Sequence, residues 1–371
     1  MSYFGENTPK LGFGLMRLPM LGEEVDIPQF AQMADRFLEA GFTYFDTAYG
    51  YISGKSEAAF KEAVIKRHPR ESFTLATKLP AWAGPKTAEE AKQMFWTSLE
   101  RTGAGYFDYY LLHNISAVRK KFFDDYGIWD FVQERKAEGL IKHVGFSFHD
   151  TADILDAVLT EHPEVDFVQL QINYVDWDNP SVQSRLCWET ARKHGKSVVI
   201  MEPVKGGTLA RLPADVRKPF EDIGLPHVAA ALRFAASLDG VITVLSGMST
   251  LEQMEQNIGY MSPFKPLDET ERGAIQAALK AMAARPSVPC TACRYCEKGC
   301  PQGIAISQVF AARNTELVYD NPEGGKNSYR FALMQGGDPA TCVGCGQCEA
   351  ACPQKISIID ELKKAVAAYA G

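Results

Sequence analysis

The sequence lacks the features that mark a membrane or a secreted protein. It has no run of about 18 apolar residues, the length that a membrane-spanning helix requires. Residues 1–6 show no basic segment followed by an apolar core, so we expect no secretory signal and a cytoplasmic location. Positive charge is not in excess, because 39 Lys and Arg stand against 46 Asp and Glu. The net charge of −7 disfavours nucleic acid as a partner, since a phosphate-binding surface needs clustered Lys and Arg.

Cysteine is nearly absent from the first three quarters of the chain, where only Cys187 occurs, in a helical pattern typical of core. The others of the nine cysteines all follow residue 289. An extracellular protein stabilised by disulfides does not normally segregate its cysteines in this way. We therefore expect the C-terminal cysteines to bind metal or iron–sulfur clusters in a reducing compartment.

The composition is otherwise that of an ordinary globular protein, with 371 residues of which 46% are hydrophobic and 23% charged. Short apolar runs alternate with segments of helical periodicity, such as 124–138. The predicted strands are 11–15, 43–46, 73–78, 107–113, 143–147, 165–171, 197–201 and 241–246. Eight such units in roughly 250 residues predict an α/β protein with a (β/α)₈ TIM barrel. An open doubly wound sheet is the alternative, although Gly12-Phe13-Gly14 does not complete the glycine pattern of a dinucleotide-binding turn.

The pattern changes after residue 261, which predicts three segments. Residues 1–261 form the barrel, and residues 262–289 form a helical linker with an Ala-rich helix at 269–284. Residues 290–371 carry the clustered cysteines and form a small second domain.

Ionisable side chains stand at or just after the ends of three successive predicted strands: Asp46 and Tyr51, then Lys78, then His113. Active sites of TIM barrels lie at this carboxyl end of the strands. Polar residues at strand ends also serve structure alone, but these types can transfer protons. Reduction of a carbonyl requires a proton donor within hydrogen-bond reach of the carbonyl oxygen.

Tyrosine is a reluctant acid because its free pKa is about 10. A neighbouring ammonium favours tyrosinate and improves the donor, and Lys78, held by Asp46, is placed to supply it. His113 is a candidate to orient the carbonyl or relay a proton.

Asp46, Tyr51, Lys78 and His113, in this order, resemble the catalytic tetrad of the aldo-keto reductases. Further segments similar to that family are 12–18, the turn with Gly54, Ser56 and Glu57, 145–147, Gln169, 202–207 and 247–257. The resemblance covers roughly residues 10–261. It implies NADPH or NADH as hydride donor, Tyr51 as general acid/base, and a small carbonyl or alcohol substrate.

The same resemblance implies a set of cofactor contacts. Its members are Gly14, Met16, Ser147, Gln169, Glu202, Val204, Gly206, Gly247, Gln253, Gln256 and Asn257. Ser147 and Gln169 would hold the nicotinamide carboxamide. The loop at 246–257 has no Lys or Arg for the 2′-phosphate of NADPH, so the choice between NADH and NADPH stays open. Lys205, in a neighbouring loop, is a candidate substitute.

Two C-terminal runs share the spacing Cys-x-x-Cys-x-x-Cys-x-x-x-Cys-Pro. The first run is Cys290, Cys293, Cys296 and Cys300, and the second is Cys342, Cys345, Cys348 and Cys352. This is the spacing of bacterial ferredoxins, present twice. Structural zinc sites instead draw on two separated pairs of ligands. The spacing therefore predicts two [4Fe-4S] clusters.

The resemblance to two-cluster ferredoxins implies that the fourth cysteine of each run binds the cluster of the other run. One cluster would take Cys290, Cys293, Cys296 and Cys352, and the other Cys342, Cys345, Cys348 and Cys300. An unshared pairing remains the alternative. The insert at 301–341 has a helical pattern, so we expect a small helical ferredoxin-like domain, with a βαβ-type ferredoxin as the alternative.

Nicotinamide transfers two electrons as hydride, whereas each cluster transfers one. A flavin normally couples the two; no motif for one is evident, and a flavin is left open as a further cofactor. We expect an NAD(P)H-linked oxidoreductase whose clusters exchange electrons with a redox partner protein. The alternative is a redox-sensing or electron-transfer protein whose barrel binds nucleotide with little turnover, as a resemblance to potassium-channel β subunits permits.

Overall fold

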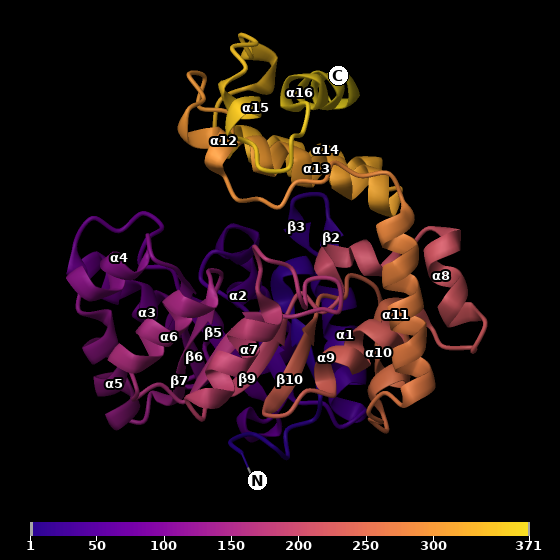
Figure 1. Ribbon diagram of the computed structural model, residues 1–371. Coiled ribbons are helices and arrows are strands. Elements are labelled where there is room, and N and C mark those ends of the chain that lie inside the picture. The colour runs from indigo at the N-terminus through magenta and orange to yellow at the C-terminus, as the bar shows by residue number, and fades with distance from the viewer. Residues whose placement is uncertain (1–2, 370–371) are drawn as a thin grey trace. The chain divides into compact units, whose positions relative to one another are not determined.

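Eight parallel strands close into a barrel in this computed structural model, which describes residues 3–369 (Figure 1). The strands are β1 (Leu11–Gly14), β4 (Tyr44–Asp46), β5 (Thr74–Leu79), β6 (Phe107–Ile115), β7 (Ile141–Phe148), β8 (Phe167–Gln171), β9 (Ser197–Met201) and β10 (Val241–Ser246). Closure follows from β1, which pairs with both β4 and β10. The (β/α)₈ barrel is therefore confirmed, and the open sheet is excluded. A short hairpin, β2 (Met20–Leu21) with β3 (Glu24–Val25), follows β1.

Helices follow the strands as the sequence pattern predicts. They are α1 (Ile27–Glu39), α2 (Lys55–Phe60), α3 (Ala88–Thr102), α4 (Lys120–Asp125), α5 (Ile128–Ala137), α6 (Ala152–Glu161), α7 (Ser184–Lys193), α9 (His227–Ala236) and α10 (Leu251–Met261). Helix α1 begins where the Asp26 side chain accepts the N–H of Gln29 at 3.0 Å. The single helix predicted at 124–138 is wrong, because Gly127 takes a φ of 61° and separates α4 from α5.

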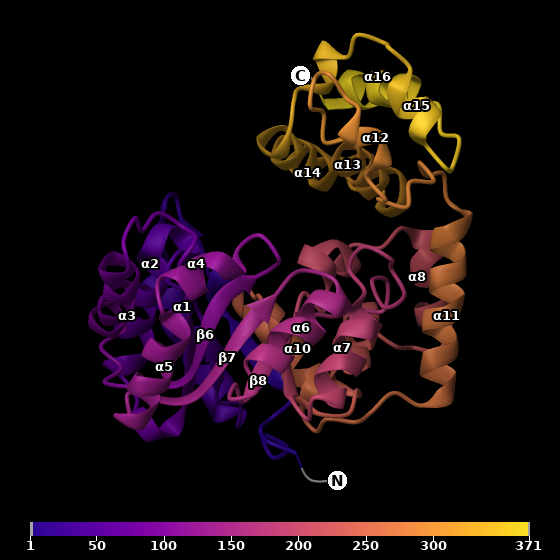
Figure 2. The ribbon, with the colours of Figure 1, turned by 60° about the vertical axis from the view of Figure 1, so that its left-hand side comes forward.

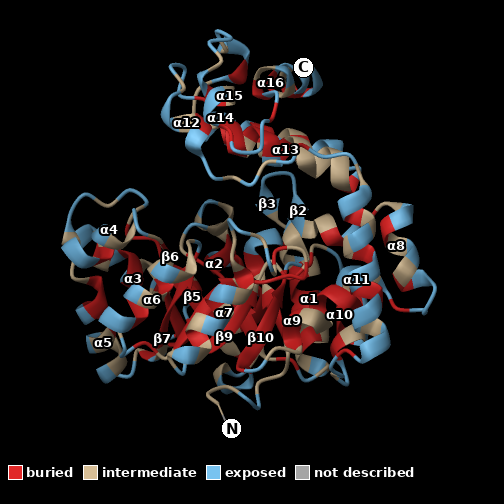
Figure 3. Ribbon diagram, viewed as in Figure 1, coloured by how far each residue is buried: buried red, intermediate tan, exposed pale blue. Residues whose placement is uncertain are grey.

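The barrel interior is filled by side chains from successive strands, and the strands are the most buried part of the barrel (Figure 3). One buried cluster contains Tyr44, Ala76, Tyr109, Leu111, Phe167, Val199, Ile242 and Leu245. Gly145 lies in β7 where a Cβ atom would stand 2.5 Å from the carbonyl oxygen of Phe167. Only glycine allows β7 and β8 to approach this closely.

The chain divides into two compact units. The first comprises the residues up to Val204 together with Ala229–Leu267, and the second comprises Lys205–Val228 together with the residues from Asp268 onward. Within the second unit, α8 (Ala214–Glu221) packs against α11 (Glu269–Ala284), and Arg285 pairs with Asp215 at 2.7 Å. The boundaries 1–261, 262–289 and 290–371 stay predictions; they did not anticipate that 205–228 groups with the C-terminal part.

The cysteine-rich part of the second unit is helical. It contains α12 (Tyr295–Lys298), α13 (Ile306–Tyr319), α14 (Pro322–Gln335), α15 (Gln347–Ala351) and α16 (Ile358–Tyr369) (Figure 2). Between residues 268 and 369 the only β-type pairing is an isolated bridge from Ile304 to Gly337. The helical arrangement is therefore confirmed over the βαβ-type one. None of the helices in residues 3–369 is long and apolar enough to cross a membrane.

Candidate active site and cluster-binding sites

Tyr51 stands in a strained loop directly after β4. Ile52 and Ser53 follow it with φ of 51° and 55°, a left-handed conformation that is unfavourable for a branched residue such as Ile52. The loop is anchored from its far side by Ser56, whose hydroxyl donates to the carbonyl oxygen of Leu15 at 2.9 Å and lies 2.8 Å from the Thr47 hydroxyl. These bonds hold the loop in the conformation that places Tyr51 above the barrel.

Asp46 and Lys78 form a buried ion pair at the carboxyl end of β4 and β5. Lys78 Nζ lies 2.5 Å from Asp46 Oδ1 and also donates to the carbonyl oxygen of Thr47 at 2.7 Å. Gln169 Nε2 donates to the second oxygen, Asp46 Oδ2, at 3.1 Å. Gln169 lies on β8, so this bond crosses the barrel.

The pKa values of both members of this pair are raised, which favours the charged form of Lys78 but the neutral form of Asp46. Desolvation lowers the pKa of Lys78, but Asp46 and Tyr51 outweigh it, and the net pKa is raised. For Asp46, burial raises the pKa more than Lys78 and Gln169 lower it. The pair is charged, because both oxygens of Asp46 accept hydrogen bonds, an arrangement that stabilises a carboxylate.

The Tyr51 ring lies between Lys78 and His113. Lys78 Nζ is 4.9 Å from the ring centroid, and the His113 ring meets that of Tyr51 edge-on at 5.9 Å. Desolvation raises the pKa of Tyr51, and the ammonium of Lys78 lowers it by less. Lys78 thus acts in the direction that the sequence predicts, but it does not dominate. The phenol is protonated at neutral pH.

His113, on β6, has a buried Nδ1 that finds no hydrogen-bond partner among residues 3–369. Desolvation, followed by the charge of Lys78, lowers its pKa well below the usual value. The imidazole is therefore neutral, and it can hydrogen-bond a substrate oxygen without carrying a charge. Its backbone carbonyl oxygen accepts the indole N–H of Trp82 at 2.8 Å.

Two of the predicted nicotinamide contacts lie side by side. Ser147 on β7 pairs in register with Gln169 on β8, and both side chains are buried. The Ser147 hydroxyl oxygen accepts the N–H of Asn114 at 2.8 Å and keeps its own proton to donate. Gly14 ends β1 in register with Asp46. These residues therefore converge on the tetrad from three sides of the barrel.

The predicted phosphate loop follows β10. Asn257 is buried and donates to the Ser246 hydroxyl at 2.8 Å, and Gln253 Oε1 accepts the N–H of Ser249 at 2.8 Å. Gly247 and Gln256 are exposed. Asn257 and Gln253 therefore stabilise the conformation of the loop, and the backbone of Gly247 is accessible to solvent.

The loop contains no Lys or Arg, but Arg17, which follows β1, lies beside it. A Cβ atom on Gly247 would stand 3.2 Å from Cδ of Arg17, and the Ser249 hydroxyl donates to the Arg17 carbonyl oxygen at 2.7 Å. Met16, before Arg17, is exposed. Sequence reasoning missed Arg17 because its proximity to Gly247 arises only when β1 pairs with β10.

The remaining predicted contacts follow β9. Glu202 has a φ of 58°, and its carbonyl oxygen accepts a hydrogen bond from Asn173 at 3.2 Å. Val204 is half-buried and is the last residue of the first unit before the chain enters the second unit at Lys205. Gly206, with a φ of 63°, and Lys205 lie in the second unit. The cofactor contacts assigned to all the residues above stay predictions.

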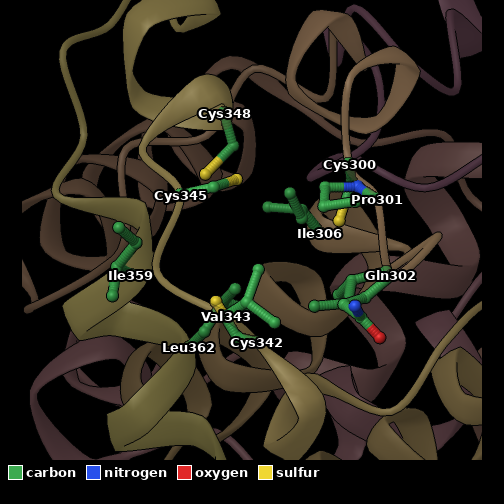
Figure 4. A pocket seen from close by; sticks show the side chains of 11 residues that line it. Cys300, Pro301, Gln302, Ile306, Cys342, Val343, Cys345, Cys348, Ile359 and Leu362 are labelled. Atoms are coloured by element: carbon green, nitrogen blue, oxygen red, sulfur yellow. The ribbon is translucent and has the colours of Figure 1, made fainter.

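The eight C-terminal cysteines line two separate cavities. Cys342, Cys345 and Cys348 surround the first together with Cys300, which comes from the other run, and the four side chains face one opening (Figure 4). Cys290, Cys293 and Cys296 line the second together with Cys352. Each cavity thus combines three cysteines of one run with the fourth of the other, as the shared pairing predicts.

The two runs also repeat each other's backbone. Left-handed residues occupy equivalent places, Ala292 and Arg294 in the first run and Gly344 and Gly346 in the second. Each run then enters a short helix that contains its third cysteine, Cys296 in α12 and Cys348 in α15.

A glutamate after each third cysteine binds the start of a longer helix. Glu297 Oε1 accepts the N–H of Ser307 at 2.9 Å, in the first turn of α13. Glu349 Oε1 accepts the N–H of Ile359 at 2.9 Å, in the first turn of α16. The cysteine loops are therefore built twice on one plan.

The donor set of the two cavities fits iron–sulfur clusters. Within residues 3–369, no three His, Cys, Asp or Glu side chains converge tightly enough to hold one metal ion. The sulfurs instead surround a space, as a cubane with one cysteine on each iron requires. Apolar side chains, among them Ile304, Ile306, Ile356 and Ile358, complete the walls.

Fold and site together define a barrel oxidoreductase with an appended iron–sulfur domain. Residues 10–280 match the model of the Aldo/keto reductase family, and residues 289–357 match a 4Fe-4S dicluster domain. The chain therefore belongs to the aldo/keto reductase family.

Relatives of the chain are named as oxidoreductases or aldo-keto reductases. An uncharacterised oxidoreductase, YqkF, of Bacillus subtilis is 25% identical over 310 residues, which cover 73% of this chain and 92% of that protein. An aldo-keto reductase of Mycolicibacterium paratuberculosis is 27% identical over 251 residues, 67% of this chain and 79% of that one.

Solved structures show the same fold. The holo form of aldo-keto reductase AKR11C1 from Bacillus halodurans has a TM-score of 0.60 and 26% identity, covering 76% of this chain and 96% of that one. An aldo-keto reductase from Klebsiella pneumoniae in complex with NADPH has a TM-score of 0.57 and 19% identity, covering 72% of this chain and 90% of that one.

Proposed function

We propose that the barrel interconverts a carbonyl and an alcohol with NADPH or NADH, and that Tyr51 is its general acid/base. The observation that carries this proposal is the meeting of Tyr51, Lys78, Asp46 and His113 at the carboxyl ends of successive strands. Ser147 and Gln169, adjacent across β7 and β8, would hold the nicotinamide carboxamide. When bound there, the nicotinamide supplies the hydride.

The residues of the site have separate tasks in this proposal. Protonated Tyr51 donates its phenolic proton to the substrate oxygen. Lys78 stabilises the phenolate that remains, and Asp46 keeps Lys78 charged and in place. Neutral His113 hydrogen-bonds the same substrate oxygen and orients it toward Tyr51. In the reverse direction Tyr51 accepts the proton of the alcohol.

NADPH is favoured over NADH by Arg17, whose side chain lies over Gly247 in the predicted phosphate loop. A guanidinium suits the 2′-phosphate that distinguishes the two nucleotides. The solved Klebsiella pneumoniae relative was obtained in complex with NADPH.

The second unit would hold two [4Fe-4S] clusters, one on Cys290, Cys293, Cys296 and Cys352 and one on Cys342, Cys345, Cys348 and Cys300. The support is the composition of the two cavities. Each cluster transfers one electron, so the proposed partner of this unit is a one-electron redox protein.

Anaerobically reconstituted protein tests the proposal. We expect oxidation of NADPH with a panel of aldehydes and ketones, and loss of at least about a hundredfold in kcat for Tyr51→Phe because a proton donor is removed. Tyr49→Phe, which changes a neighbouring ring packed under Arg101, is the matched control. If wild type and Tyr51→Phe both bind nucleotide without turnover, the redox-sensing alternative replaces the proposal.

A further inference from the structure

Arg119 extends the wall of the proposed active site beyond His113. Its guanidinium carbon lies 4.1 Å from the centroid of the Trp82 ring. The Trp82 ring in turn stands 6.4 Å from that of His113 and donates its N–H to the His113 carbonyl oxygen. A series of ring contacts therefore runs from Tyr51 through His113 and Trp82 to the guanidinium of Arg119.

The charge of Arg119 is not matched by an acidic side chain among the residues that the structure describes. The nearby carboxylate of Asp150 accepts the backbone N–H groups of Ala117 and Thr151, both at 2.9 Å. The adjacent Lys120 pairs with Asp124 and Glu161. Desolvation lowers the pKa of Arg119, with no carboxylate to offset it. A partly buried cation of this kind is stabilised when an anion arrives.

His149, directly after β7, is a further ionisable side chain close enough to Arg119 to feel its charge. Desolvation by protein atoms, followed by the charges of Arg119 and Lys78, lowers the pKa of His149 to about 4. His149 is nevertheless exposed to solvent, which weakens this desolvation, and its ring is neutral at pH 7 on either ground. The two side chains whose pKa values the charge of Arg119 lowers, His113 and His149, are neutral, and Asp46 is engaged by Lys78 and Gln169. The carboxylate of Asp150 is bound by backbone N–H groups and forms no ion pair with Arg119 among the described residues.

We propose that the carbonyl substrate carries a carboxylate or a comparable anionic group, which Arg119 binds while the carbonyl oxygen meets Tyr51 and His113. A guanidinium stacked on an indole face keeps its N–H edge free for two parallel hydrogen bonds to a carboxylate. This inference names a substrate class and rests on the function proposed above. The competing role for Arg119 is to pack on Trp82 and no more.

A pair of aldehydes of nearly equal shape separates the two roles: 4-carboxybenzaldehyde and its methyl ester, methyl 4-formylbenzoate. We expect wild-type protein to favour the carboxylate by roughly tenfold to a hundredfold in kcat/KM, mainly through KM, as a charge-assisted contact implies. Arg119→Met should abolish this preference and leave the ester's kcat/KM within about threefold, whereas Arg119→Lys should retain part of the preference.

Arg135→Met is the matched control, because Arg135 also stacks on an indole, that of Trp96, away from the tetrad. Equal kcat/KM for the two aldehydes in wild type overturns the inference, as does an equal loss for both in Arg119→Met. These results leave the proposed function standing.

Benzoate binding by calorimetry gives a readout that does not depend on turnover. If no aldehyde is reduced but benzoate binds to wild type and not to Arg119→Met, the anion site stands and the proposed function fails. If benzoate binds neither protein, or binds both equally, the anion site is refuted.

Discussion

Gln169 and Asp46 are joined across the barrel by a hydrogen bond of 3.1 Å from Nε2 to Oδ2. Lys78 contacts the other carboxylate oxygen, so the buried Asp46 depends on two donors from different strands. Gln169 therefore has a structural partner in the tetrad as well as its predicted contact with the nicotinamide.

Gln169→Leu should leave one buried oxygen of Asp46 without a donor, which costs about 1–3 kcal/mol. Because Asp46 would then hold Lys78 less firmly, we expect kcat to fall roughly tenfold or more. The predicted nicotinamide contact should appear separately, as a higher KM for NADPH. Steady-state kinetics with varied NADPH measures both.

The same strand offers a control for Gln169. Gln171 lies two residues after Gln169, at the end of β8. It donates to Asp176 at 3.0 Å and has no contact with the tetrad among the hydrogen bonds of the described residues. Gln171→Leu should leave kcat within about threefold of wild type. Equal losses in the two variants would show that Gln169 acts through the fold of β8 and not through Asp46.

The pH dependence of carbonyl reduction follows from the pKa directions of Tyr51 and His113. The acid must be protonated, and the raised pKa of Tyr51 keeps it so through neutral pH. Because the pKa of His113 is lowered well below its usual value, the imidazole stays neutral at every pH above that lowered pKa. We expect kcat/KM to be flat from about pH 6 to about pH 9 and to fall only where tyrosine ionises, above about 10.

His113→Gln serves as the comparison for this profile. It should lower kcat/KM without changing the flat shape, because the imidazole does not titrate in that range. A limb near pH 6.5 that disappears in His113→Gln would instead show that His113 ionises, and would contradict its assigned role as a neutral hydrogen-bonding group.

The sequence predicts what depends on local pattern and leaves out what depends on closure of the barrel. The eight strands follow from short apolar runs between amphipathic helices, and the site at their carboxyl ends follows from the TIM-barrel rule. The contact of Arg17 with Gly247 and the bond from Gln169 to Asp46 join residues far apart in the chain. Neither position carries a local signal for its partner.

The two cysteine loops should differ in stability when a methyl group is added to one loop or removed from the other. Ala292 and Gly344 occupy equivalent places with φ of 54° and 67°. Left-handed backbone costs a residue with a Cβ roughly 1–2 kcal/mol. Gly344→Ala should therefore lower the stability of the second loop by about 1 kcal/mol, whereas Ala292→Gly should be neutral or slightly stabilising.

Anaerobic guanidinium titration measures this difference, with the visible absorbance of the cluster as the signal. Ala350→Gly, in the helical turn of α15 next to the second loop, reports the cost of losing a methyl group in helical backbone. A stability unchanged in Gly344→Ala would contradict the left-handed backbone at that position.

The exchange of the fourth cysteines between runs gives the sharpest test of the cluster unit. In a variant with Cys342, Cys345 and Cys348 changed to Ala, only the cavity lined by the first run retains its cysteines. That cavity contains Cys352 and not Cys300, although Cys300 belongs to the same run. Adding Cys352→Ala should therefore remove the remaining iron, and adding Cys300→Ala should leave it. The two quadruple variants share three substitutions and differ only in whether Cys352 or Cys300 is the fourth cysteine replaced, so they serve as each other's control. Iron and sulfide analysis with the anaerobic visible spectrum measures the outcome, and loss of iron on adding Cys300→Ala but not Cys352→Ala would establish the unshared pairing instead.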